Sequence, residues 1–99
     1  MKVREFLTVD PATLHLPGSR RDGADPTKLM RQVNRHGSSI VGMPPIEVKR
    51  GSDGGLVIFD GVTRATRAAK YLPGKPVTVE ITGELMGPVG SLPMVGERI

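Results

Sequence analysis

Hydrophobic and polar residues alternate over two short segments, 46–49 and 77–82, as they do in strands that bury one face. Segment 6–9 is a third strand candidate, and a turn signal follows it. Segment 56–59 is apolar throughout, which is typical of a buried strand. The turn-forming residues 51–55 separate it from 46–49, so these two segments predict a hairpin whose second arm is buried.

Helical spacing of apolar residues replaces alternation in two other parts of the chain. The first helix is predicted to begin after the N-cap signal Asp25-Pro26 and to end before Gly37. Three apolar residues form its inward face: Leu29, Met30 and Val33. The second helix spans 62–72 and is stopped by Pro73-Gly74. Its apolar face consists of Val62, Ala65, Ala68, Ala69 and Leu72.

The predicted elements all lie within residues 1–82, which we interpret as one domain. The remaining segment, 83–99, is rich in glycine and proline but keeps seven apolar side chains, too many for a free linker. We expect this tail to pack over the core as extended chain. The alternative is that it is an arm that binds a partner protein.

Composition narrows the chemistry open to a chain of 99 residues. The absence of cysteine excludes thiol redox chemistry, thiolate nucleophiles and Cys-ligated zinc. The two histidines are too few for a metal site, so we interpret His15 as partly packed and His36 as a partner of a helix C-terminus. No apolar run approaches the ~18 residues of a membrane span. We therefore expect no membrane contact, and location in the cytoplasm or export as part of a longer chain.

The formal net charge of +4 is unevenly distributed along the chain. Segment 20–50 holds seven basic and three acidic residues, and segment 61–75 holds four basic residues and no acidic one. Such zoning favours an anionic partner, of which phosphate is the commonest kind. The alternative is a basic protein whose charges only keep it in solution.

The turn between the buried strand and the second helix carries the clearest chemical signal. Arg64 and Arg67 lie at the start of the helix, where the macrodipole already supplies positive charge. A bound phosphate would compensate them, accepting bonds from turn N–H groups, the Thr63 hydroxyl and Arg64, with Gly61 allowing close approach. The alternative is that Thr63 caps the helix, Asp60 pairs with Arg64, and Arg67 is solvated.

A series of short motifs follows in order along the chain: a P-I-x-V strand at 45–48, a Gly-rich turn, the D-G-x-x-R turn at 60–64, an alanine-rich helix and a P-V-x-V strand at 76–79. This order of motifs resembles the ParB/sulfiredoxin-like domain. The resemblance covers roughly residues 6–81. It implies an α+β domain with a small mixed sheet and two to three short helices, which binds a nucleotide or phosphate.

Matched residue by residue, Gly61 and Arg64 correspond to the family's phosphate-cradling glycine and arginine, and Asp60 to the residue often found before them. Sulfiredoxins have a catalytic cysteine where Val62 stands, so sulfinic acid reduction is excluded. ParB proteins commonly have G-E-R-R at this turn, followed by a helix-turn-helix domain, and both are missing here. The family also includes ADP-dependent serine kinases and small domains at the ends of bacterial secreted toxins, some of them predicted nucleases.

Three functions remain open from the sequence. An enzyme of phosphoryl transfer or phosphodiester cleavage, including a toxin domain, needs a base or Mg²⁺ ligand among Asp60, Asp22 and Glu47, and a nucleotide with Mg²⁺ is its expected cofactor. A module that binds a nucleotide or nucleic acid without catalysis is the second, and a protein-interaction domain is the third. Secondary phosphate contacts are expected from Arg67 and from the loop residues Arg20 and Arg21.

A further basic feature lies on the first helix, opposite its apolar face. Lys28, Arg31 and Arg35 are spaced three and four residues apart, so they form one stripe. A duplex backbone could meet this stripe through about three phosphates. The alternative is that the stripe is only solvated.

Overall fold

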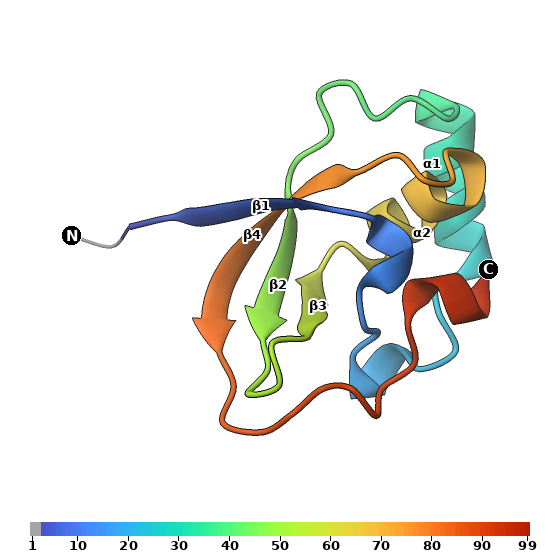
Figure 1. Cartoon of the computed structure of the whole chain (residues 1–99). Coiled ribbons are helices and arrows are strands. Elements are labelled where there is room, and N and C mark those ends of the chain that lie inside the picture. Colours follow the sequence, from blue (N-terminus) through green and yellow to red (C-terminus); the bar gives the residue numbers. More distant parts are fainter. Residues whose placement is uncertain (1–2) are drawn as a thin grey trace.

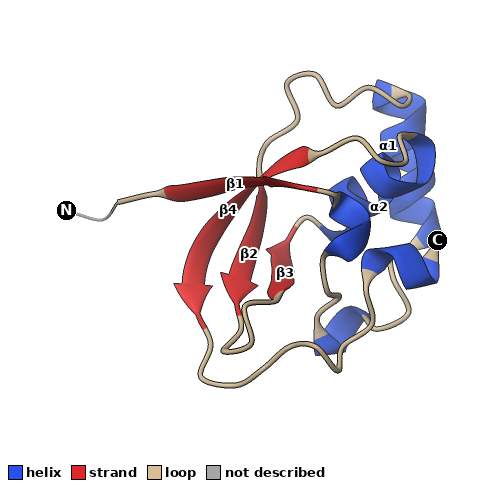
Figure 2. Cartoon of the chain, viewed as in Figure 1, coloured by secondary structure: helices blue, strands red, loops and turns tan. Residues whose placement is uncertain are grey.

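The computed structural model describes residues 3–99 as an α+β fold in which helices lie on one side of a four-stranded sheet (Figure 1). The strands are β1 (Glu5–Val9), β2 (Ile46–Arg50), β3 (Leu56–Asp60) and β4 (Val77–Glu84). The helices are α1 (Pro26–His36) and α2 (Val62–Tyr71). Three short 3-10 turns complete the chain: Pro11–Thr13, Gly18–Arg20 and Val95–Arg98. Figure 2 shows that the helices and turns gather on the same side of the sheet.

The sheet has the order β1-β4-β2-β3 and is mixed. β4 pairs antiparallel with β1 and parallel with β2, and β2 and β3 form the predicted antiparallel hairpin. β4 can run parallel to β2 because β3 first carries the chain back to the end of the sheet where β2 begins, and α2 then connects β3 to β4. The start of α2 lies directly after the end of β3.

The predicted helices are confirmed, and so are their start and stop signals. The Asp25 carboxylate caps α1 by accepting a hydrogen bond from the Thr27 N–H at 2.8 Å. The alanine face of α2 is buried, since Ala65, Ala68 and Ala69 are each less than 5% exposed. Small side chains on this face let the helix lie close to the sheet. On α1, however, Met30 is 55% exposed, because that helix packs through the flank that carries Leu29 and Val33.

The prediction that the second hairpin arm is buried is only partly correct. Val57 and Ile58 are buried, but Phe59 is 64% exposed. Glu47 pairs with Asp60 and Val48 with Ile58, so Phe59 is the extra residue of a β-bulge. The bulge turns its ring away from the core, and the Lys49 ammonium lies 4.5 Å from the ring centroid.

Segment 85–99 returns across the domain and covers part of the core. The Leu16 N–H donates to the Pro93 carbonyl at 2.7 Å, and the Val95 N–H donates to the Leu14 carbonyl at 2.8 Å. Val89 and Val95 are both buried. The half-buried His15 ring donates from Nδ1 to the Leu92 carbonyl, 2.8 Å away, so that nitrogen carries the proton.

The loop between β2 and β3 binds segment 85–99 through the carboxylate of Asp53. The Asp53 carboxylate accepts hydrogen bonds from the N–H groups of Gly55, Val89 and Gly90. The bond from Gly55, followed by those from Val89 and Gly90, holds the pKa of Asp53 below its ordinary value. Asp53 thus ties the returning segment to the hairpin turn.

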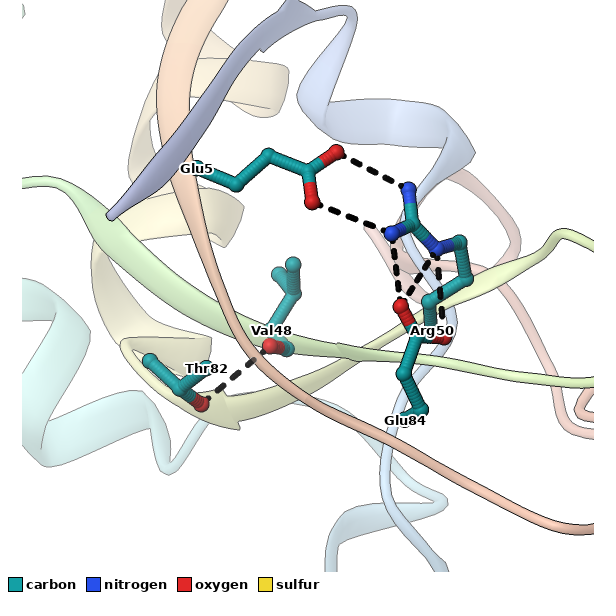
Figure 3. A network of polar contacts seen from close by, with 5 residues as sticks. All are labelled: Glu5, Val48, Arg50, Thr82 and Glu84. Atoms are coloured by element: carbon teal, nitrogen blue, oxygen red, sulfur yellow. Dashed lines mark hydrogen bonds and ion pairs between the residues drawn. The ribbon is translucent and has the colours of Figure 1, made fainter. Parts of the chain in front are cut away.

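Acidic and basic side chains pair at the end of the sheet where β2 and β4 finish. Figure 3 shows the Arg50 guanidinium donating to both Glu5 on β1 and Glu84 on β4, with a shortest distance of 2.6 Å to Glu84. Its hydrogen bond lowers the pKa of Glu84, and Arg4 does the same to Glu80. In the same figure, the Thr82 hydroxyl donates to the Val48 carbonyl at 3.3 Å. The three glutamates of this region therefore all have an arginine partner, and Glu5 and Glu84 share Arg50.

Neither helix of the described chain is long and apolar enough to cross a membrane. Within residues 3–99, no three histidine or acidic side chains come together as a metal site would require.

Candidate functional site

The site is built around the turn by which β3 enters α2. Gly61 occupies the N-cap position with a φ of 112°, a left-handed conformation that favours glycine. Within the part of the chain that the structure describes, no side chain caps this helix. The alternative in which Thr63 caps the helix is therefore wrong, because Thr63 lies inside the first turn. The N–H groups of this turn carry the positive end of the helix dipole.

Arg64 folds back over this turn. Its Nη2 atom lies 3.6 Å from Asp60 Oδ2 and donates a weak hydrogen bond to the Pro45 carbonyl at 3.4 Å. Its Nε atom is buried and has no partner among residues 3–99. The Asp60–Arg64 pair expected under the structural alternative is therefore present, but it leaves part of the Arg64 guanidinium unsatisfied.

Arg67 lies one turn further along α2, on the same flank as Arg64. Its side chain is only 3% exposed, so the alternative in which Arg67 is solvated is wrong. Its Nε and Nη1 atoms contact no hydrogen-bond acceptor in the described chain. Burial lowers the pKa of Arg67, and the charge of nearby Arg64 lowers it further. A buried guanidinium without an anion is costly, because its lost hydration is not replaced.

Two clefts meet beside these arginines. The first has a volume of about 470 Å³ and lies between the Gly61 turn, the start of α1 and the loop that precedes it. Its polar lining consists of Ser19, Arg20, Asp25, Lys28, Gln32, Asp60, Thr63 and Arg64. The second has a volume of about 390 Å³ and lies between α1, α2 and the loop at 39–44. Its polar lining consists of Arg31, Gln32, Arg35, His36, Ser39, Arg64 and Arg67.

The sequence-predicted residues divide between these clefts and the rest of the surface. The first cleft brings together Asp60, Gly61, Thr63, Arg64 and Arg20. Arg67 lies in the second cleft, which Arg64 also lines.

Three other predicted residues lie elsewhere. Arg21 and Asp22 line a shallow hollow before α1, which adjoins the first cleft at Ser19, Arg20 and Asp25, but neither residue lines the first cleft itself. Glu47 pairs with Asp60 in the strand register but lines neither cleft. Asp60 and Asp25 are therefore the acids of the first cleft, and Asp25 already serves as the cap of α1.

Sequence reasoning missed Gln32 as a site residue. Gln32 lines both clefts, and its Oε1 atom is buried without a partner within residues 3–99. Its spacing of four from Lys28 and three from Arg35 was the available signal. The stripe of Lys28, Arg31 and Arg35 also lines the clefts, with Lys28 in the first and Arg31 and Arg35 in the second.

The arrangement can bind an anion. Guanidinium groups, a hydroxyl and the N–H groups of a helix N-terminus all donate hydrogen bonds, and phosphate oxygens accept them. A search against family models finds no match to this chain, and a search of curated proteins likewise finds none.

Proposed function

We propose that the protein binds a phosphate-bearing ligand, a nucleotide or nucleic acid, at the turn formed by residues 60–64, as a domain of the ParB/sulfiredoxin-like type. The observation that carries the proposal is the Arg64 guanidinium, whose buried Nε atom has no partner within residues 3–99, lying over a helix N-terminus that no side chain of the described residues caps. A phosphate at this turn would accept hydrogen bonds from Arg64 and from the turn N–H groups. Arg67, buried without an acidic partner in the adjoining second cleft, adds to the positive charge. Each hydrogen bond to a charged group contributes about 1.5–3 kcal/mol.

The local order of elements supports the same proposal. The β2–β3 hairpin, the Gly61 turn, α2 and the closing strand β4 follow one another as the resemblance implies. Gly61 is the N-cap with a positive φ, and Arg64 lies over it. A phosphate at this turn would face N–H groups that no side chain of the described residues caps.

A catalytic version of this function depends on Asp60. Its side chain is 62% exposed and lines the first cleft, so it is accessible to a ligand there. With a nucleotide bound, Mg²⁺ would be held by Asp60 and by phosphate oxygens, since magnesium commonly uses one or two carboxylates. Such a site would suit phosphoryl transfer or phosphodiester cleavage, including that of a nuclease toxin domain. Asp22 lies outside the cleft and has no part in it.

The binding proposal is tested by calorimetry and thermal unfolding with orthophosphate, CTP, ATP and ADP, with and without Mg²⁺. A ligand at one hundred times its Kd should stabilise the fold by about 2.7 kcal/mol. Arg64→Ala should weaken binding by about 1.5–3 kcal/mol. The matched control is Arg21→Ala, which removes a cation outside both clefts.

If no phosphate compound binds, the proposal is wrong and the protein-interaction alternative takes its place. If Arg21→Ala weakens binding as much as Arg64→Ala does, the ligand is held by overall charge and not by this turn. Catalysis is tested separately, by measuring the products of phosphoryl transfer or phosphodiester cleavage for the parent and for Asp60→Asn. Equal turnover by this variant and the parent would exclude Asp60 as the base or metal ligand.

A further inference from the structure

The basic stripe of α1 forms one wall of both clefts. Lys28 lines the first cleft, and Arg31 and Arg35 line the second. Gln32 lies between them on the same flank of the helix and contributes to both. Lys28 and Arg35 are seven residues apart, which is about 10 Å along a helix. The cations therefore follow a line instead of converging on one point.

The opposite wall runs in the same order along α2. Asp60, Gly61 and Thr63 line the first cleft, Arg64 lines both, and Arg67 lines the second. The clefts thus share Gln32 and Arg64, one from each wall. The two clefts adjoin at this pair, so a ligand that occupies both must pass over Gln32 and Arg64; together the adjoining clefts are called the groove between α1 and α2.

The charge of this groove exceeds what a single phosphate needs. Six basic side chains line it: Arg20, Lys28, Arg31, Arg35, Arg64 and Arg67. The carboxylates that line it are Asp25 and Asp60. One phosphate at the Gly61 turn would leave the cations of the second cleft uncompensated. The line of charge fits a chain of phosphates that enters both clefts.

Two features distinguish a single strand from a duplex. Arg67 lines the second cleft and is only 3% exposed, so a ligand must enter the cleft to contact it, which suits a flexible strand better than the convex backbone of a rigid duplex. Phe59 lines the first cleft and is 64% exposed, with the Lys49 ammonium over one face of its ring. An exposed aromatic ring beside a cationic groove is a stacking platform for an unpaired base.

We infer that the groove between α1 and α2 binds an extended single strand of nucleic acid, with phosphates along Lys28, Arg31, Arg35, Arg64 and Arg67 and a base on Phe59. The inference rests on the proposed phosphate site, because the Gly61 turn holds one of the phosphates. The strand continues from that turn into the second cleft.

The inference is tested by fluorescence anisotropy with labelled DNA and RNA single strands of about twelve nucleotides, within the usual site sizes. The single strand should bind more tightly than a duplex of equal length. Three to four neutralised phosphates predict a log–log salt slope of about −2 to −3. Arg35→Gln should make this slope shallower by about 0.7, whereas Arg21→Gln, outside the groove, should leave it unchanged. Phe59→Leu should weaken the affinity for the single strand about fivefold or more and change the affinity for the duplex little.

Three outcomes would overturn the inference. Equal or tighter binding of the duplex would mean that the stripe of α1 meets nucleic acid from outside the groove. A slope that Arg35→Gln leaves unchanged would confine the ligand to the first cleft. Binding of triphosphate or nucleotide, but no tighter binding of strands, would leave the proposed function intact and refute the groove. Failure of every phosphate compound, orthophosphate included, would refute both.

Discussion

The guanidinium of Arg64 lies against Gly61 at a distance that only a glycine permits. A Cβ atom on Gly61 would lie 2.8 Å from Arg64 Nη2 and 3.3 Å from Arg64 Cζ. The glycine therefore serves both the backbone, through its φ of 112°, and the position of the arginine.

Gly61→Ala is expected to destabilise the fold by about 1–2 kcal/mol, because an alanine is strained at positive φ. It should also weaken phosphate binding, because the Arg64 side chain must move away from the new Cβ. Denaturant unfolding and ligand titration measure the two effects. Gly74→Ala is the matched control, since Gly74 has a φ of 82° and open space where its Cβ would stand. Equal losses of affinity in both variants would show that the Gly61–Arg64 contact does not position the arginine for a ligand.

Arg67→Met is expected to leave the free energy of unfolding unchanged or to raise it by about 1 kcal/mol or more, because it removes a buried charge without a partner. Phosphate binding should fall in the same variant. Such opposite changes are typical of a residue kept for its ligand. Denaturant unfolding of the ligand-free protein checks the first effect. A clear loss of stability would show that Arg67 is instead a structural element of the α1–α2 contact.

The ionised Asp53 carboxylate is expected to stabilise the fold, and this stabilisation is expected to be lost at low pH. Its pKa is lower in the folded protein than its ordinary value of 3.8, so its contribution is present above that pH and disappears as the pH falls through the folded-state pKa. Asp53→Asn should therefore unfold at a lower temperature than the parent at about pH 6, and the difference should shrink as the pH falls below 3.8. Thermal unfolding as a function of pH measures this change. A difference that stays constant as the pH falls would assign the effect to the shape of the loop and not to the charge.

Val95→Ala tests whether the returning segment belongs to the core. Val95 is 1% exposed, and the loss of its two methyl groups should destabilise the fold by about 2 kcal/mol. Val41→Ala is the control, because Val41 is 93% exposed and its substitution should change stability by less than about 0.5 kcal/mol. Similar, small effects of both substitutions in denaturant unfolding would show that segment 85–99 is not part of the cooperative fold.

The elements of the fold could be predicted because their signals are local. Alternation located β2 and β4, and the Asp25-Pro26 pair located the start of α1. The bulge at Phe59 could not be predicted, since it depends on which residues of β2 lie opposite. A run of four apolar residues is compatible with either register.

The candidate site was predictable only in part for the same reason. Gly61 and Arg64 are neighbours in sequence, and the D-G-x-x-R pattern identifies them. The spacing of Gln32 places it on the flank of Lys28 and Arg35, but that this flank lines the clefts depends on how α1 packs against α2. The burial of Arg67 depends on the same contact, and no pattern within α2 encodes it. Arginine side chains usually lie in solvent. Arg67 is buried only because of the tertiary structure around it.

The paired acids at the end of the sheet have a consequence for how the molecule meets its partners. The groove carries six cations and two carboxylates, an excess of four, which equals the formal net charge of the whole chain. The rest of the molecule is balanced, with Glu5, Glu80 and Glu84 held by arginines. Because the excess positive charge lies at the groove, the protein has an electric dipole moment, which orients the groove toward a polyanion before contact. Steering of this kind raises association rates by about 10- to 1,000-fold and fades as salt is added.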